Sequence, residues 1–117
     1  MKRTIIIKKN YEFKKMFSKG KFFYGEYVHF YIVNNKLNYN KFGIAISKKQ
    51  GKAVSRNHIK RLIRENYKII EDRIKVGYSF LIIINKKKYI KNITFYNIKE
   101  DFENILKKAG IILWKKY

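Results

Sequence analysis

The 117-residue sequence contains no cysteine, which excludes disulfide bonds, zinc sites built on thiolates and thiol nucleophiles. It also contains no proline, and no Pro/Gly/Ser-rich linker, internal repeat or low-complexity tail divides it. The longest strongly apolar stretch covers only residues 80–84, whereas a membrane helix needs about 20 residues. The apolar residues 5–7 are likewise too few for a signal peptide. We therefore expect one soluble, cytoplasmic domain over residues 1–117, with no membrane partner.

Acidic residues are also scarce: 8 Asp and Glu stand against 29 Lys and Arg, which gives a formal net charge of +21. Repulsion on this scale opposes folding, and a compact basic protein tolerates it when a polyanion neutralises the charge. Nucleic acid is the favoured polyanion, ahead of an anionic membrane. Disorder is disfavoured, because 46% of the residues are hydrophobic and 17% aromatic, enough for one modest core.

The basic residues that carry information lie in the middle of the chain. Lysine is abundant everywhere, as the usage of an AT-rich genome would give, so a scattered lysine indicates little. Arginine is more informative, because there are only five, and Arg56, Arg61 and Arg64 lie within nine residues of each other. No acidic residue occurs between Glu26 and Glu65. We expect this central part to face the polyanion.

Hydrophobic periodicity predicts an α+β fold, a single-domain α/β sandwich with the order αβββαβα or close to it. Three helices are expected, the first capped by Asn10 and stopped by Gly20, the second running from Ser55 to about Ile70, and the third from Thr94 to Gly110. Strands are placed at residues 26–33, 42–48 and 78–84, with a polar turn over residues 34–41 and a lysine loop at residues 86–88. The second helix would therefore lie inside a βαβ unit.

Polar residues of the second helix fall on one arc at roughly 100° per residue. They are Arg56, Asn57, Lys60, Arg61, Arg64 and Lys68. Lys and Arg bind phosphates by charge and, for Arg, bidentately, and the Asn57 amide can reach a base edge or a 2′-hydroxyl. The alternative is an ordinary solvated face of an amphipathic helix.

Aromatic residues form a second constellation. The strand at 26–33 places Tyr27, His29, Tyr31 and Val33 on one face and Val28, Phe30 and Ile32 on the other. With Phe13, Phe17 and the small residues Gly43, Ala45 and Ser47, the first face would form a shallow cleft on which unpaired bases stack. Lys48 and Lys49 at its end suit phosphates. The alternatives are that Phe13 and Phe17 are core residues and that these lysines are merely exposed.

The segment from Ala53 to Glu65 resembles the signature R-N-x-x-K-R-x-x-R of the bacterial ribonuclease P protein subunit. The resemblance covers Lys9 to about Leu113 and includes Phe13-x-x-x-Phe17-x-x-Gly20, Ser47-Lys48-Lys49 and Leu106-Lys107-Lys108-Ala109-Gly110. One position departs from the pattern, because His58 stands where the family usually has arginine. By its helical angle His58 lies off the centre of the basic arc.

The resemblance implies a protein that works with a catalytic RNA subunit to remove the 5′ leader of precursor tRNA endonucleolytically. It implies that the basic helix contacts the catalytic RNA, and that Phe17 and Tyr31, with Phe13, Lys48 and Lys49, hold the leader. It also implies Mg²⁺ bound mainly by RNA and a left-handed βαβ crossover, against the usual rule.

The sequence offers little for catalysis by the protein itself. His29 and His58 are the sole imidazoles, and Glu100, Asp101 and Glu103 are expected to form a solvated helix face rather than a metal site. We therefore predict no catalytic centre and no metal site in the protein, and a self-sufficient basic ribonuclease is disfavoured. The main alternative is a structural RNA-binding protein, such as a small ribosomal protein.

Overall fold

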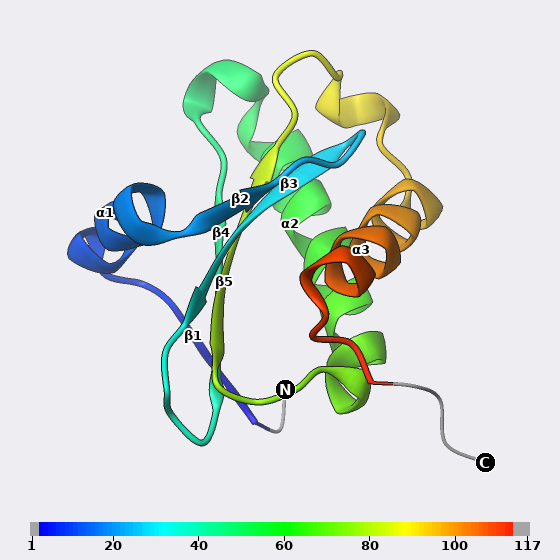
Figure 1. Cartoon of the computed structure of the whole chain (residues 1–117). Helices are drawn as coiled ribbons and strands as arrows, with labels where there is room; N and C mark the ends of the chain where they lie inside the picture. The colour runs from blue at the N-terminus through cyan, green and yellow to red at the C-terminus, as the bar shows by residue number, and fades with distance from the viewer. Residues whose placement is uncertain (1–2, 114–117) are drawn as a thin grey trace.

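The computed structural model describes residues 3–113 and consists of one five-stranded sheet with helices on both faces (Figure 1). The strands are β1 (Thr4–Ile6), β2 (Lys21–Phe23), β3 (Val28–Asn34), β4 (Asn40–Ala45) and β5 (Tyr78–Ile84). Their order in the sheet is β1-β4-β5-β3-β2. β4 pairs in parallel with both β1 and β5, and β3 pairs antiparallel with β5 and β2. The first two and last four residues of the predicted domain lie outside the described range.

Three helices complete the fold: α1 (Asn10–Lys19), α2 (Ala53–Ile70) and α3 (Phe95–Ala109). Short 3-10 turns lie between them, η1 (Lys48–Gln50), η2 (Glu71–Arg73) and η3 (Ile90–Asn92). The α+β class is confirmed, and the order is the predicted one with a strand, β1, added in front. The predicted order contains four strands, of which hydrophobic periodicity placed only three. β2 is the fourth. No helix within residues 3–113 is long and apolar enough to cross a membrane.

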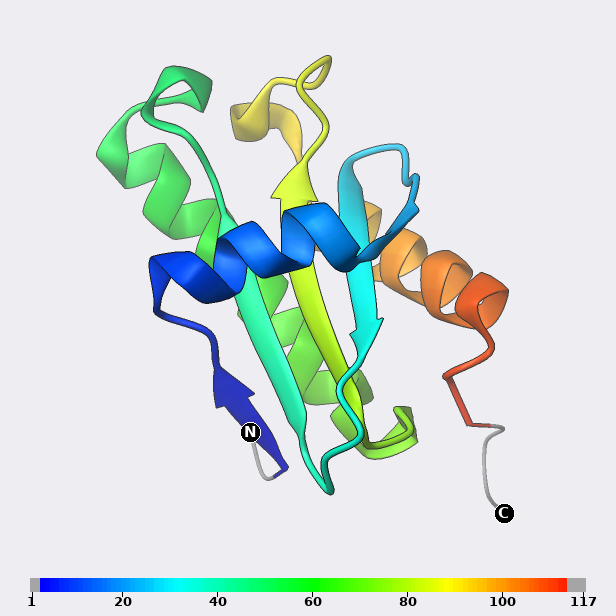
Figure 2. The ribbon, with the colours of Figure 1, turned by 60° about the vertical axis from the view of Figure 1, so that its left-hand side comes forward.

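The connection from β4 through α2 to β5 has the unusual hand that the resemblance implies. In Figure 2, seen from the side of α1, both strands run upward, β5 lies to the right of β4, and α2 passes behind the sheet. Seen from the side of the helix, the second strand therefore lies to the left of the first. This is a left-handed crossover, where a right-handed one is the rule.

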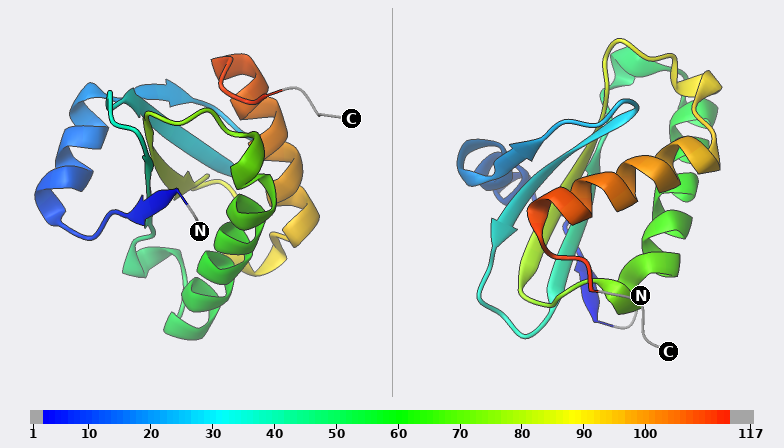
Figure 3. Two further views of the ribbon diagram at one scale, coloured as in Figure 1. Left: turned by 90° about the horizontal axis from the view of Figure 1, so that it is seen from below. Right: turned by 45° about the vertical axis from the view of Figure 1, so that its right-hand side comes forward.

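The main core lies between the sheet and the pair α2 and α3, which share one face (Figure 3). Val28, Phe30 and Ile32 of β3 are buried there, so the predicted alternation of this strand is confirmed. Tyr27 departs from it, because it precedes the strand and packs against this main core. A smaller cluster under α1 buries Ile7, Met16 and Leu81, with Phe13, Tyr31, Val33, Ala45 and Ile83 packed around it.

Two of the predicted helix caps are wrong. α1 is preceded by Lys9 and α2 by Lys52, both with extended backbone and without a side-chain capping bond. Asn10 and Ser55 therefore lie inside the first turns. A cap contributes only about 1 kcal/mol, so a capping side chain alone does not decide where a helix begins.

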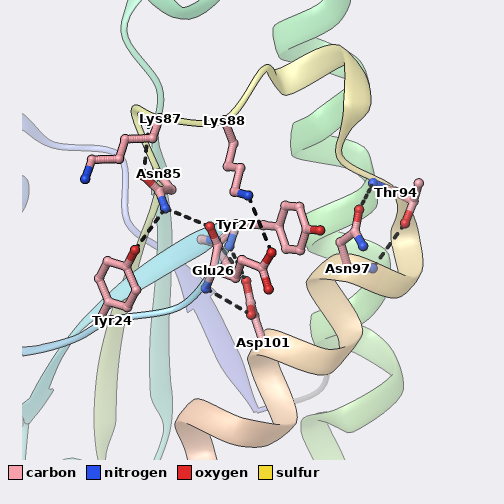
Figure 4. A network of polar contacts seen from close by, with 10 residues as sticks. Tyr24, Glu26, Tyr27, Asn85, Lys87, Lys88, Thr94, Asn97 and Asp101 are labelled. Carbon is pink, nitrogen blue, oxygen red and sulfur yellow. Dashed lines mark hydrogen bonds and ion pairs between the residues drawn. The ribbon is translucent and has the colours of Figure 1, made fainter.

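The other predicted helix ends agree with the structure. Thr94 caps α3, accepting a bond from the Asn97 N–H at 3.1 Å, and Gly110 ends it with a left-handed backbone (Figure 4). Gly20 does end α1, but with an extended backbone. A Cβ atom there would lie 2.5 Å from the carbonyl oxygen of Met16 and 3.0 Å from Cβ of Tyr31. This glycine therefore lets the end of α1 pass close to β3.

The strand predicted at residues 42–48 is displaced toward the N-terminus. β4 starts at Asn40, inside the predicted polar turn, because it pairs with β1 over residues 40–42. The Asn40 side chain is buried and accepts a hydrogen bond from the Tyr78 N–H at 3.0 Å. At the other end, Ser47 begins the capped turn η1, in which its N–H donates to Oε1 of Gln50 at 3.1 Å.

Strand β1 is held against α2 by a small polar cluster. Oγ1 of Thr4 lies 2.7 Å from the Tyr67 hydroxyl and donates to Oε2 of Glu71 at 2.5 Å. The Tyr67 ring is buried and stacked on Phe42, with the ring centroids 4.3 Å apart. Burial raises the pKa of Tyr67 to about 12. This side of α2 is therefore committed to the fold, which leaves the opposite side for other contacts.

Candidate nucleic-acid interface

The predicted basic arc lies on the side of α2 that faces away from the core. Ile59, Ile63 and Ile70 of the same helix are buried against the sheet. Four of the six predicted residues are exposed: Asn57, Arg61, Arg64 and Lys68. The other two, Arg56 and Lys60, are half-buried. The helix therefore presents its cationic face while its apolar stripe anchors it.

This cationic face reaches the edge of the sheet. Lys60 and Arg64 line a small hollow of about 140 Å³ together with Ile6, Phe42 and Gly43, among others, from β1 and β4. Nε of Arg56 is buried and makes no hydrogen bond within the described part of the chain. No ion pair within residues 3–113 involves the arginines of this face. Their charges are available to a partner.

His58, at the departure from the family pattern, is exposed beside this face. Its Nδ1 lies 3.1 Å from Nη2 of Arg61. Because a guanidinium only donates, Nδ1 of His58 is the acceptor in this contact. The residue at the departure therefore touches Arg61, which belongs to the cationic face.

The predicted aromatic cleft is a hollow of about 870 Å³ between α1, the sheet and η1. All five residues predicted to hold an RNA strand line it: Phe13, Phe17, Tyr31, Lys48 and Lys49. Phe17 is 46% exposed, so it is not a core residue. Its ring meets that of Tyr31 edge-on, with the ring centroids 5.1 Å apart. Phe13 is half-buried and belongs partly to the cluster under α1.

The floor of the cleft differs in part from the prediction. Ala45 and Ser47 line it, but Gly43 is covered, because a Cβ there would meet Ile7 and Phe13 at 3.1 Å. The glycine lets α1 and its preceding segment lie close on β4.

His29 also lies outside the cleft. Its ring stacks on Tyr24 at 4.7 Å, and its Nδ1 accepts a hydrogen bond from the Gly25 N–H at 3.1 Å. Burial lowers the pKa of His29, which favours the neutral ring. His29 and His58 thus have separate partners and form no acid–base pair with each other.

Sequence reasoning missed one ring beside the cleft and one residue of its lining. Phe22 of β2 does not line the cleft, but it is 45% exposed and its ring centroid lies 5.2 Å from that of Tyr31. Lys86, from the loop after β5, lines the cleft opposite α1. The lysine run at 86–88 was a signal for the second, but only the pairing of β4 with β5 brings that loop to η1. No described acidic side chain lines the cleft.

Asp101 does not belong to the predicted solvated face of α3, whereas Glu100 is exposed as predicted. Asp101 is buried and its carboxylate accepts from the N–H groups of Tyr27 at 2.7 Å, Val28 at 3.0 Å and Glu26 at 3.2 Å (Figure 4). Glu103 instead lies 3.6 Å from Arg73. Asp101 therefore fixes the turn that leads into β3.

The fold and its surfaces define a class of protein. A small α+β protein with a net charge of +21, a cationic helix face and an acid-free aromatic cleft has the features of a nucleic-acid-binding protein. Exposed rings beside lysines suit unpaired bases, which stack on them in any sequence.

Comparison with known proteins gives the family within that class. The family model described as Ribonuclease P matches residues 1–110. The ribonuclease P protein component of Clostridioides difficile (strain 630) is 39% identical over 110 residues, 93% of this chain and 95% of that protein. The chain belongs to the ribonuclease P protein family, whose members act with an RNA subunit in 5′ processing of tRNA. This decides against a small ribosomal protein.

Solved structures of the family share the fold. The RNase P protein of Staphylococcus aureus matches with a TM-score of 0.79 and 35% identity, covering 92% of this chain and 96% of that one. The RNase P protein of Thermotoga maritima matches with a TM-score of 0.79 and 28% identity, covering 89% and 96%. The predicted fold class is therefore confirmed.

Proposed function

We propose that this protein binds the RNA subunit through the cationic face of α2 and the 5′ leader of precursor tRNA through the aromatic cleft. In this proposal the RNA subunit carries the catalytic centre and holds the Mg²⁺ ions. The observation that carries the proposal is the acid-free cleft, in which the exposed ring of Phe17 meets the ring of Tyr31 edge-on and lysines lie at the end.

The cleft suits a single strand better than a duplex. Its exposed rings offer π faces and edges to unpaired bases, whereas the bases of a duplex are already stacked on each other. Lys48, Lys49 and Lys86 line the hollow next to the rings and can neutralise the phosphates of the same strand. The leader is the part of precursor tRNA that mature tRNA lacks, so a strand held here distinguishes substrate from product.

The face of α2 suits a folded RNA. Its Lys and Arg side chains stand on a rigid 18-residue helix, which fixes their spacing for a structured array of phosphates. The charge of the protein would also reduce the repulsion between two RNA molecules, and so lower the Mg²⁺ concentration that they need to associate.

Most carboxylates of the described chain have partners within the protein. Asp101 binds backbone N–H groups, Glu71 binds Thr4, and Glu12, Glu26 and Glu103 each lie near a basic side chain. Among residues 3–113 no group of three or more His, Cys, Asp or Glu converges to hold a metal ion. Where Mg²⁺ is bound, it supplies the Lewis acid and the activated water for hydrolysis of the phosphodiester.

The Tyr31 side chain provides the sharpest test of the cleft. In the assembled enzyme, Tyr31→Ala should weaken the binding of precursor tRNA by about 1 to 3 kcal/mol, because it removes a ring on which a leader base stacks. Tyr31→Phe keeps the ring and should bind nearly as the wild type does. Binding titrations of precursor and mature tRNA at fixed salt and Mg²⁺ measure both.

Mature tRNA should lose little affinity for either Tyr31 variant. Tyr11→Ala is the matched control, because Tyr11 is an exposed tyrosine of α1 that lines a different hollow. Equal losses for precursor and mature tRNA with Tyr31→Ala would show that the cleft does not hold the leader.

A further inference from the structure

A second hollow of about 470 Å³ opens beside the cleft, between η1 and the loop that joins β5 to η3. It shares Ser47, Lys49, Gln50 and Lys86 with the lining of the cleft, so the two hollows adjoin each other. Its further lining residues are Lys87, Lys88 and Tyr89, for which neither the sequence nor the family resemblance gave a role. As in the cleft, no acidic side chain of the described chain lines it.

The loop that carries these residues is held in place. Nδ2 of Asn85 donates to the carbonyl oxygen of Glu26 at 2.7 Å, and Oδ1 of Asn85 accepts from the Lys87 N–H at 3.1 Å (Figure 4). Asn85 is buried, and so is Ile90, which follows the loop. Both ends of the loop are therefore anchored in the protein, and the lysines between them have a fixed place next to η1.

The three lysines of the loop are not equivalent. Nζ of Lys88 lies 3.4 Å from Oε2 of Glu26 and 5.0 Å from the centre of the Tyr27 ring. Lys87 extends to the other side of the turn in Figure 4. Within residues 3–113, no carboxylate lies within ion-pair distance of Lys86, Lys87 or Lys49. These three charges face the hollow without an internal counterion.

Tyr89 adds an aromatic surface to this charge. Its side chain is 77% exposed, although the residue after it is buried. A large ring held in water beside uncompensated lysines combines the two elements that bind single strands, a stacking surface and cations for the phosphates. The cleft has the same combination in Tyr31 and Lys48.

We infer that this second hollow is a binding site for single-stranded RNA that continues the cleft, with a base on Tyr89 and phosphates near Lys86 and Lys87. The inference rests on the proposed function, because the strand that enters it is the leader after it has left the cleft. Leaders long enough to reach Tyr89 would then gain affinity that shorter leaders lack.

The test uses the reconstituted enzyme and precursor tRNAs whose leaders are lengthened one nucleotide at a time. Wild-type affinity should rise again once the leader passes a threshold length beyond the cleft. Tyr89→Ala should abolish this second rise, a loss on the order of tenfold for the longest leaders, and leave the shortest leaders unaffected. Tyr89→Phe should retain it, and Lys87→Gln should reduce it and its dependence on salt.

Tyr96→Ala is the matched control, because Tyr96 is a 74% exposed tyrosine on α3 that lines neither hollow. An effect of Tyr89→Ala that is the same for every leader length, or no effect at all, would overturn the inference. If Tyr31→Ala still discriminates precursor from mature tRNA, the proposed function stands without it. If Tyr31→Ala does not discriminate, both fail together.

Discussion

Replacing Arg61 and Arg64 together with alanine should weaken binding of the RNA subunit by about 2 to 4 kcal/mol. Both side chains are exposed on α2, and each is placed to make a charge-assisted contact to phosphate. The slope of log affinity against log salt concentration should fall by about one for each phosphate that the variant no longer neutralises. Filter binding of the RNA subunit over a range of salt concentrations measures both quantities.

The stability of the protein should hardly change, because substitutions at exposed positions away from the core usually change the free energy of unfolding by less than about 0.5 kcal/mol. Replacing Lys99 and Lys107 with alanine removes the same charge from exposed positions of α3 and should reduce affinity far less. Arg61→Lys with Arg64→Lys keeps the charge and should recover only part of the affinity. Normal RNA binding by the double alanine variant would mean that this helix face is merely solvated.

Replacing Asp101 with alanine should lower the free energy of unfolding by about 3 kcal/mol or more. The change leaves the N–H groups of residues 26–28 without their acceptor at a largely buried site. Asp101→Asn retains one acceptor oxygen and should cost less. Urea unfolding followed by circular dichroism gives the three values.

Glu100→Ala is the control for Asp101, because Glu100 is the neighbouring acid on α3 and is exposed. The free energy of unfolding of this variant should lie within about 0.5 kcal/mol of the wild-type value. If Asp101→Ala were equally stable, the carboxylate would not be what holds the turn into β3. The prediction also bears on function, since Tyr31 lies on the strand that this turn begins.

The sequence predicted the elements that have a strong period of their own. Alternation in residues 28–33 and the apolar stripe of α2 both reflect burial of one side of a regular element, which a single segment shows. Periodicity also placed Phe13, Phe17 and Tyr31 on candidate cleft faces, but it did not exclude a core role for the two phenylalanines. The family resemblance favoured the cleft for Phe17 and Tyr31, and both line it.

What the sequence did not show depends on partners distant in the chain. β1 is three residues long and forms only because β4 lies beside it, and Asn40 joins β4 for the same reason. Asp101 looks like a solvated helical acid until the turn before β3 places three N–H groups at it. Lys86 reaches the cleft only through the β4–β5 pairing. Local pattern carries no information on such pairings.

In the proposed function, two separate surfaces bind the two RNA molecules. α1 and α2 lie on opposite faces of the sheet (Figure 2). The cationic face of α2 borders β1 and β4, whereas the cleft lies between α1, the sheet and η1. An RNA subunit bound to the first surface would therefore leave the second open to the leader. The high net charge then acts on both contacts.

We propose that the protein supports catalysis by RNA without a reaction centre of its own. Cleavage of 5′-end-labelled precursor tRNA should be followed across a Mg²⁺ titration with protein alone, RNA subunit alone and both together. We expect no cleavage by rigorously RNA-free protein at any Mg²⁺ concentration, and a lower Mg²⁺ requirement for the RNA subunit when the protein is added. Mg²⁺-dependent cleavage at the 5′ end by the RNA-free protein, or an unchanged requirement in the mixture, would contradict it.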